Sequence, residues 1–418
     1  MRYVGIEKFV TCAEEFKRFG ECKSLMICTV EATTHYDYIS SNFPSTVHTT
    51  APSLDALKDM LVNGACNVIA TEQLQIFNSD IEEGVANGTY VLGGKAFTKE
   101  PLAVVTRKND REWSDIVNWV VRALIHGEKK GLKRDMSLCG QGNNNLVPFD
   151  LAFDNAVYCV GNYGEIFYTN FDRRDRAPIN TINNGTPMIY AIPHGNINSR
   201  ETFDLDSGDE SSNDVARLDI NENDFLRCGV VSIEDSRGDL TGLSVDYCHA
   251  LAAALFHGNS AALTLEFFAE DDYNAIDALL NGTIDVLAGS QVNLETDVWL
   301  QFSTPYFYQN AENGDEVKVF ALATRNDDTY FSSFVHSIML TTVYAQESGI
   351  TQESNRGMPL ISVFGTEYSW AMREAIAYSG SYDEMYHKHF GTSPLQRGRN
   401  QLNINETSQL LSPSMNFR

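Results

Sequence analysis

The sequence contains one long stretch twice, and this duplication limits the folds that the chain can adopt. The first copy runs from Thr106 to Phe167 and the second from Thr324 to Tyr386. The matched residues keep almost the same spacing. They are Thr106, Arg107, Asp110, Gly131, Gly161, Tyr163 and Glu165 in the first copy, and Thr324, Arg325, Asp328, Gly349, Gly380, Tyr382 and Glu384 in the second. Solenoid repeats are shorter and more numerous, so the pattern indicates a duplicated unit instead.

Each copy contains the pattern of an amphipathic helix. In the first copy, apolar residues recur at steps of three and four, and polar residues lie on the opposite face. The apolar residues are Trp113, Ile116, Val117, Val120, Val121 and Leu124. Such a face is normally buried, so we expect this helix to pack in a core.

Length and composition indicate a globular protein that does not bind nucleic acid. The chain has 418 residues, enough for roughly two to three domains. Its hydrophobic content of 43% is in the globular range, and no apolar run approaches the roughly 20 residues of a membrane helix. A formal net charge of −25 disfavours nucleic acid as a partner, and we see no local basic patch.

The eight cysteines indicate an oxidising compartment. Neighbouring cysteines suggest four pairs, although proximity alone leaves other connectivities open. The pairs are Cys12 with Cys22, Cys28 with Cys66, Cys139 with Cys159, and Cys228 with Cys248. The even count favours disulfides over free thiols, and the absence of a CxxC motif disfavours zinc and thioredoxin-like chemistry. The N-terminal segment lacks the apolar core of a signal peptide, so we expect that any leader is not present in this chain.

The first 75 residues or so are predicted to form an α/β unit. Residues 24–30 and 66–70 are strand candidates, and helices are expected after Thr33 and after Ser53. A further strand over 100–106 is expected to lead into the first copy.

The second half of the chain predicts a parallel sheet. Strands and helices alternate, which is typical of a right-handed parallel arrangement. The expected strands are 225–233, 263–268 and 284–288, and the expected helices are 243–256 and 274–280. A ligand crevice would then lie outside the carboxyl ends of these strands.

These segments resemble a known family. The stretches LRCGVVSIEDSRGDLTGLSVDYCHALAAALFHG and IDALLNGTIDVLAGS resemble periplasmic solute-binding proteins of family 3, in particular those serving general L-amino-acid ABC importers. The stretches LMICTVEATT, NGACNVIATEQ and KEPLAVVTRKNDREWSDIVNWVV resemble the second lobe of that family and its return to lobe one. The resemblance implies an α/β fold of the type II periplasmic-binding-protein kind, with Venus-flytrap lobes and, here, a partial internal duplication. It also implies an extracytoplasmic location, periplasmic or secreted.

The order of the segments departs from the family, whose chains run from lobe one to lobe two and back. Residues 1–195 resemble lobe two plus the return to lobe one, and 225–392 resemble lobe one with lobe two missing. An acidic linker over 196–224 and a polar tail over 393–418, which we expect to be unfolded, complete the chain. Either residues 225–310 fold back to complete the first unit as a circular permutant, or a lone lobe accompanies an incomplete partner.

The resemblance also implies where a ligand would bind. Family members hold the carboxylate of an amino acid with an arginine in lobe one and its ammonium with an acid in lobe two. Glu72 occupies the position of that acid, and Thr33 and Thr34 occupy a turn where a helix N-terminus can receive a carboxylate. The alternatives are a solvated charge for Glu72 and plain helix capping for the two threonines.

The arginine of lobe one has no counterpart. No arginine occurs between Arg237 and Arg325. The remaining ligand candidates there are Ser290, Gln291 and Thr296, whose neutral side chains would weaken carboxylate binding by ~1 to 2 kcal/mol.

No sequence pattern indicates catalysis. There is no GxSxG or HExxH motif, and His387 and His389 are spaced unlike a helical zinc pair. We therefore expect no enzyme, metal or cofactor. The expected function is extracytoplasmic solute binding, for amino acids or related small polar solutes, feeding transport or sensing through an ABC permease or a membrane receptor. The alternative is a ligand-free descendant that acts as an interaction or sensor scaffold.

Overall fold

The computed structural model describes most of the chain, in two compact units. The described residues are 2–3, 24–43, 46–72, 84, 87–92, 102–107, 110–140, 149–171, 176–184, 188, 224–233, 238–270, 273–310, 317–391 and 397–403. The first unit comprises Met1–Leu102 and Pro193–Phe203, and the second comprises Ala103–Ile192 and Asp204–Arg418. Cys12, Cys22 and nearly all of the predicted linker lie outside the described residues. The predicted unit 1–195 is divided between the two compact units, whereas the first copy, 106–167, lies wholly in the second.

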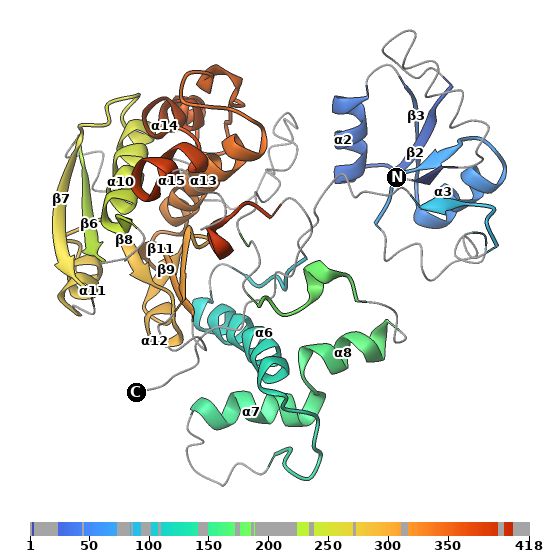
Figure 1. Ribbon diagram of the computed structural model, residues 1–418, viewed down its shortest axis with the longest axis horizontal. Coiled ribbons are helices and arrows are strands. Elements are labelled where there is room, and N and C mark those ends of the chain that lie inside the picture. Colours follow the sequence, from blue (N-terminus) through green and yellow to red (C-terminus); the bar gives the residue numbers. More distant parts are fainter. Residues whose placement is uncertain are drawn as a thin grey trace, which may run out of the picture. The chain divides into compact units, whose positions relative to one another are not determined.

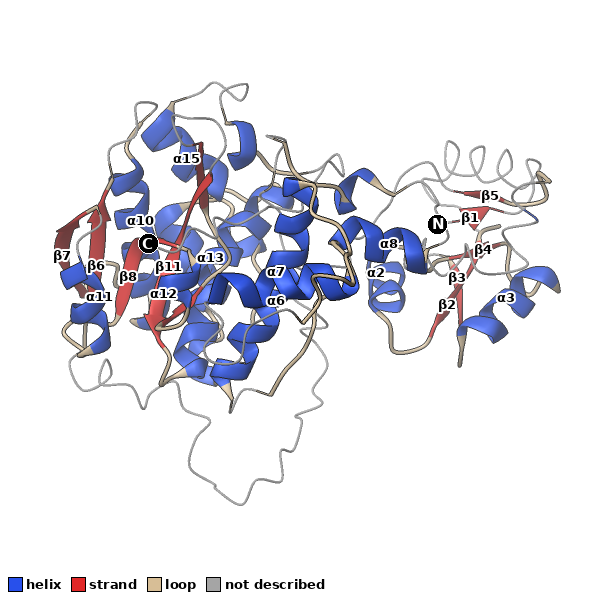
Figure 2. Ribbon diagram, turned by 90° about the horizontal axis from the view of Figure 1, so that it is seen from below, coloured by secondary structure: helices blue, strands red, loops and turns tan. Residues whose placement is uncertain are grey.

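The first unit is built on a five-stranded sheet in the order β3-β2-β4-β1-β5. Figure 1 labels β2 and β3, and Figure 2 labels all of these strands. Its strands are β1 Arg2–Tyr3, β2 Met26–Val30, β3 Val47–Ala51, β4 Val68–Ile69 and β5 Val91–Leu92. β2 pairs in parallel with β3 and β4, and β1 pairs antiparallel with β4 and β5. The two predicted strands and both predicted helices are present, the helices as α2 Thr34–Asn42 and α3 Leu54–Val62.

One core cluster of the first unit lies between α3 and the sheet, and a second includes Ile39 of α2. Leu57 and Leu61, one turn apart on α3, are buried against Cys28 and Ile69. Cys28 also forms a disulfide with Cys66, as the sequence suggested. The disulfide therefore ties β2 to the segment between α3 and β4, next to the apolar packing of α3 on the sheet.

The second unit contains a six-stranded mixed sheet with the main path β10-β11-β8-β6-β7 (Figure 2). Its strands are β6 Leu226–Ser232, β7 Leu263–Ala269, β8 Val286–Gln291, β9 Leu300–Phe302, β10 Phe307–Asn310 and β11 Val317–Arg325. β6 pairs in parallel with β7 and β8, which confirms the predicted parallel half. β11 runs antiparallel to β8, β9 and β10.

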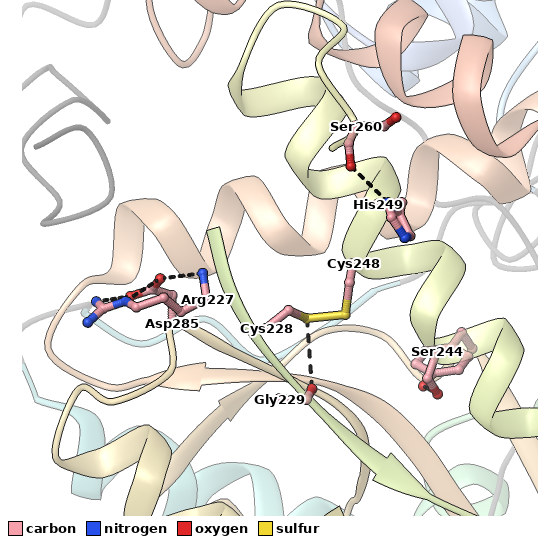
Figure 3. Close-up of a disulfide and its surroundings, with 9 residues drawn as sticks. Arg227, Cys228, Gly229, Ser244, Cys248, His249, Ser260 and Asp285 are labelled. Carbon is pink, nitrogen blue, oxygen red and sulfur yellow. Dashed lines mark hydrogen bonds and ion pairs between the residues drawn. A yellow bond between two sulfur atoms is a disulfide. The ribbon is translucent and has the colours of Figure 1, made fainter. Parts of the chain in front are cut away.

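Four helices lie together beside this sheet (Figure 1). They are α10 Leu240–Leu255, α13 Thr329–Glu347, α14 Ala371–Ser379 and α15 Tyr382–Phe390, and the short helices α11 Tyr273–Leu280 and α12 Leu294–Asp297 adjoin the strands. A disulfide between Cys228 and Cys248 ties β6 to α10 (Figure 3). α10 is buried on nearly all its faces, and its residues are accordingly apolar on nearly all of them.

The two sequence copies form the same local structures. The first copy gives α6 Arg111–Lys130, α7 Phe149–Val160 and α8 Tyr163–Asn170, which correspond to α13, α14 and α15. Asp110 caps α6 and Asp328 caps α13, each with its side chain accepting a backbone N–H. A threonine–serine hydroxyl pair recurs, at 2.5 Å for Thr106 and Ser114 and at 2.6 Å for the corresponding pair in the second copy. The partial internal duplication is therefore visible in hydrogen bonding as well as in sequence.

The same caps recur at the ends of the copies. α8 and α15 both begin with a capping box, formed by Asn162 with Glu165 and by Ser381 with Glu384. The predicted disulfide of the first copy, Cys139 with Cys159, joins the segment after α6 to α7.

The prediction of a strand over 100–106 is wrong for the described part of that segment. Residues 102–107 are in no strand, and Val105 is 89% exposed. Its counterpart Ala323 is fully buried in β11, where β8 and β9 lie on either side. Strands form by pairing with neighbours more than by residue preference, and the described residues supply no such neighbours to the first copy.

The strand pairing also bears on the circular-permutant alternative. β8 pairs with β11, so residues 226–310 complete the sheet of the second copy. On α13 the side chain of Phe331 is only 4% exposed. Its counterpart on α6, Trp113, is 55% exposed, so the equivalent helix face of the first copy is open to solvent.

α6 instead packs through its other side against α12 and β9. Trp119 is 1% exposed, and its indole N–H donates to the Asp297 carboxylate at 2.7 Å. Trp119 also contacts Phe153 and Leu294. The predicted apolar stripe therefore marks the face of α6 that is equivalent to the buried Phe331 face of α13. The contact of α6 with α12 is made instead by the face that carries Trp119.

This interface contains a carboxyl group with a displaced pKa. Burial raises the pKa of Asp115 to about 6, although Arg111 at 3.2 Å opposes the shift and Asp297 adds to it. A carboxyl whose folded pKa lies above its unfolded value stabilises the fold most below the unfolded pKa, and this stability is lost as pH rises through about 6.

We therefore expect Asp115→Asn to gain stability relative to the native chain between pH 4 and pH 7, because asparagine carries no charge at either pH. Urea unfolding of both proteins across that range measures the difference. A constant difference would show that the carboxyl does not titrate in this window.

Part of the polar tail is packed rather than unfolded. Asn400 is fully buried, and its side chain exchanges hydrogen bonds with the backbone of Tyr308 at 2.7 and 2.8 Å. Arg397 forms an ion pair with Asp383 at 2.8 Å. Polar side chains can thus hold a segment that lacks apolar residues. No helix of the described residues is long and apolar enough to span a membrane.

Candidate functional site

The first unit brings its predicted site residues to one edge of its sheet. β2, β3 and β4 are parallel, so their carboxyl ends lie at the same edge. Thr33 follows β2 and Glu72 follows β4. In open α/β sheets this edge is where ligands bind.

Thr33 fixes the start of α2 at this edge. Its hydroxyl donates to the Val30 carbonyl at 2.7 Å and accepts from the Tyr36 N–H at 3.3 Å, which makes it the N-cap. Thr34 is the exposed first residue of the helix. The capping role expected as the alternative for Thr33 is therefore present, and it also orients the helix N-terminus toward this edge.

Glu72 lies three residues beyond β4 and is partly exposed. A carboxylate that keeps contact with water remains available to an ammonium group. The geometry thus offers a helix N-terminus and an acid at the ends of neighbouring strands, a combination that suits a small molecule carrying both charges.

The candidates of the second unit lie at the carboxyl end of β8. Ser290 and Gln291 are its last two residues, and Ser290 is 5% exposed. Gly289 precedes them with a φ of +80°, and a side chain there would lie 3.2 Å from both the Ser244 hydroxyl and the Val231 carbonyl. Only glycine combines this conformation with such a close approach of α10 and β6 to the end of β8.

Thr296 is engaged within the fold. Its hydroxyl donates to the Gln291 carbonyl at 3.0 Å, and it forms a capping box with Asn293 at the start of α12. The structure therefore gives Thr296 a role in holding the segment after β8, and its ligand contact stays a prediction.

Arg227, on the neighbouring strand β6, cannot replace the missing arginine. Arg227 forms an ion pair with Asp285, which immediately precedes β8 and so lies at its amino end (Figure 3). The pair stabilises the sheet at the edge opposite the candidate site.

A second polar cluster joins α10 to α15. Asp246 accepts hydrogen bonds from Lys388 at 2.7 Å and from His389 at 2.7 Å. Burial opposes the charge of Asp246, but these bonds outweigh it and hold the pKa of this carboxyl below its usual range. His387 instead pairs with Asp383. The two histidines thus bind different carboxylates, and the described residues contain no cluster suited to a metal ion.

Comparison with curated proteins supports the resemblance. No protein-family model matches the chain. The putative amino-acid ABC transporter-binding protein YhdW of Escherichia coli is 28% identical over 181 residues, which cover 38% of this chain and 52% of YhdW. The general L-amino acid-binding periplasmic protein AapJ of Rhizobium johnstonii is 27% identical over 202 residues, 41% of this chain and 58% of AapJ. The chain thus spans about half the length of the curated relatives it matches, and both relatives are named for amino-acid binding, as the resemblance predicted.

Two solved structures resemble part of this chain. An ABC transporter periplasmic binding protein from Brucella ovis with glutathione bound is 15% identical, with a TM-score of 0.34, and the match covers 45% of this chain and 98% of that one. A cysteine-binding protein from Campylobacter jejuni is 12% identical, with a TM-score of 0.26, and the match covers 31% and 87%.

Proposed function

We propose that this chain is an extracytoplasmic solute-binding protein for amino acids or related small polar solutes, and that it feeds transport or sensing. The observation that carries the proposal is the carboxyl edge of the first sheet, where the N-terminus of α2 and Glu72 follow neighbouring parallel strands.

The two features match the two charges of a free amino acid. A helix N-terminus presents backbone N–H groups and a partial positive charge, which favour a carboxylate. A carboxylate such as Glu72 forms charge-assisted hydrogen bonds with an ammonium. Thr33 holds the helix start in place, so the carboxylate end of the site is pre-formed.

The names of the relatives point the same way. YhdW and AapJ are described as binding proteins for amino acids, and AapJ as periplasmic. The three disulfides of the described residues suit an oxidising compartment, which supports a location outside the cytoplasm. The partner would be an ABC permease or a membrane receptor. Binding alone, without a chemical step, accounts for these features.

Replacing Glu72 with glutamine is expected to raise the Kd for the bound amino acid at least about tenfold, because the ammonium loses a charge-assisted bond. Isothermal titration with the 20 standard amino acids measures this. Asp59→Asn is the matched control, since Asp59 is an exposed acid on α3 of the same unit. Equal Kd values for Glu72→Gln and the native chain would remove Glu72 from the site.

A further inference from the structure

An ion pair in the second unit connects two strands that are not neighbours. The Lys318 ammonium, near the start of β11, donates to the carboxylate of Glu270, which follows β7. Their side chains are 37% and 32% exposed, so both reach solvent. The pair could not be predicted from the sequence, because the two residues are far apart in the chain and belong to no motif.

The position of the pair follows from the sheet order. β8 and β6 lie between β11 and β7. Neighbouring strands are ~4.8 Å apart, so β11 and β7 are separated by ~14 Å. Two extended side chains are needed to cover that distance, and they must meet over the two strands between them.

The register of the strands places the Lys318–Glu270 ion pair at the carboxyl edge of the sheet. Gln291, the last residue of β8, pairs with Phe320, so Lys318 lies beyond the end of β8. Ser232, the last residue of β6, pairs with Ala269, so Glu270 lies beyond the end of β6. The ion pair therefore extends across the edge where Ser290 and Gln291 lie and where ligands of open α/β sheets bind.

We infer that Lys318 and Glu270 are a recognition pair for the zwitterion of a free amino acid, with Lys318 binding its carboxylate and Glu270 its ammonium. The inference rests on the proposed function and adds a binding site in the second unit. Lys318 supplies a cation in place of the lobe-one arginine, which has no counterpart in this sequence. A partly exposed ion pair contributes little to stability, so a ligand that offers both opposite charges can separate the two side chains at small cost.

The chemistry predicts which analogues discriminate between the two residues. The α-amide of an amino acid lacks the carboxylate, and the α-hydroxy acid lacks the ammonium. Lys318→Met should therefore bind the amino acid and its amide about equally, whereas Glu270→Gln should bind the amino acid and its hydroxy acid about equally. The native chain should prefer the amino acid over both.

The experiment is isothermal titration of the full chain with the standard amino acid that the native protein binds most tightly, and with its amide and hydroxy acid. Lys318→Met and Glu270→Gln should each raise the Kd for the amino acid at least about tenfold. Asp327→Asn is the control, because Asp327 forms a similar ion pair with Arg325 at the other end of β11. Thermal unfolding confirms that each variant remains folded.

The outcomes separate this inference from the proposed function. Native-like Kd values in both variants, with Glu72→Gln weakened, would overturn the recognition pair and leave the proposed function standing. Weakened Lys318 and Glu270 variants with a native-like Glu72→Gln would support the pair and remove Glu72. No binding of any amino acid by the native chain would overturn both.

Discussion

Replacing Trp119 with alanine is expected to lower the free energy of unfolding of the second unit by about 3 to 5 kcal/mol. The side chain is 1% exposed and packs against Phe153 and Leu294, so its removal leaves a cavity. It also leaves the Asp297 carboxylate without the indole N–H that donates to it at 2.7 Å. Both losses occur where α6 meets α12.

Trp113→Ala is the matched control on the same helix. Trp113 is 55% exposed, so its loss should cost less than about 1 kcal/mol. Urea unfolding of the three proteins, followed by circular dichroism, gives the comparison. Equal destabilisation by the two substitutions would mean that Trp113 is as buried as Trp119 and would contradict the account.

Replacing Asp285 with asparagine is expected to cost about 3 kcal/mol. The carboxylate is 3% exposed and accepts the backbone N–H of Arg227 at 2.9 Å and its guanidinium N–H at 3.0 Å. Asparagine removes the negative charge, so the largely buried Arg227 guanidinium loses its anionic partner. This pair holds β6 to the start of β8, so its loss weakens the centre of the sheet.

Asp327→Asn provides the reference for a solvent-exposed pair. The Asp327 side chain is 69% exposed beside Arg325, and exposed pairs contribute roughly 0 to 1 kcal/mol. Thermal unfolding at low and high salt compares the two variants. A similar small effect for Asp285→Asn would show that Arg227 finds other partners in water.

Local patterns in the sequence predicted most of the elements. Ser53 and Thr33 were expected before helices and are their N-caps, because a hydroxyl that accepts a backbone N–H acts within a few residues. The strands β6 and β8 were expected from continuous apolar runs, which is how strands buried on both faces appear.

The pairing of strands that are far apart in the sequence could not be fully predicted. Residues 102–107 have the composition of a strand, yet only the second copy pairs its equivalent with β8 and β9. β3 was not expected, since its Val47 and the residues after it are largely exposed and become a strand by pairing with β2.

The candidate site residues likewise fall into those that the sequence could identify and those that it could not. Thr33 and Glu72 could be chosen because the family resemblance implied them, and Ser290 and Gln291 because they are hydrogen-bonding residues just after the predicted strand 284–288. Lys318 and Glu270 could not be chosen, because their meeting depends on the order of four strands in one sheet.

The central claim, amino-acid binding, is tested most directly by thermal unfolding of the oxidised protein with and without each standard amino acid at millimolar concentration. A ligand at 100 times its Kd adds ~2.7 kcal/mol to the folded state. We predict a clear upward shift of the Tm for one chemical class of amino acid. A sample that unfolds cooperatively and shows no shift with any of them would contradict the proposal and favour a scaffold that binds proteins instead.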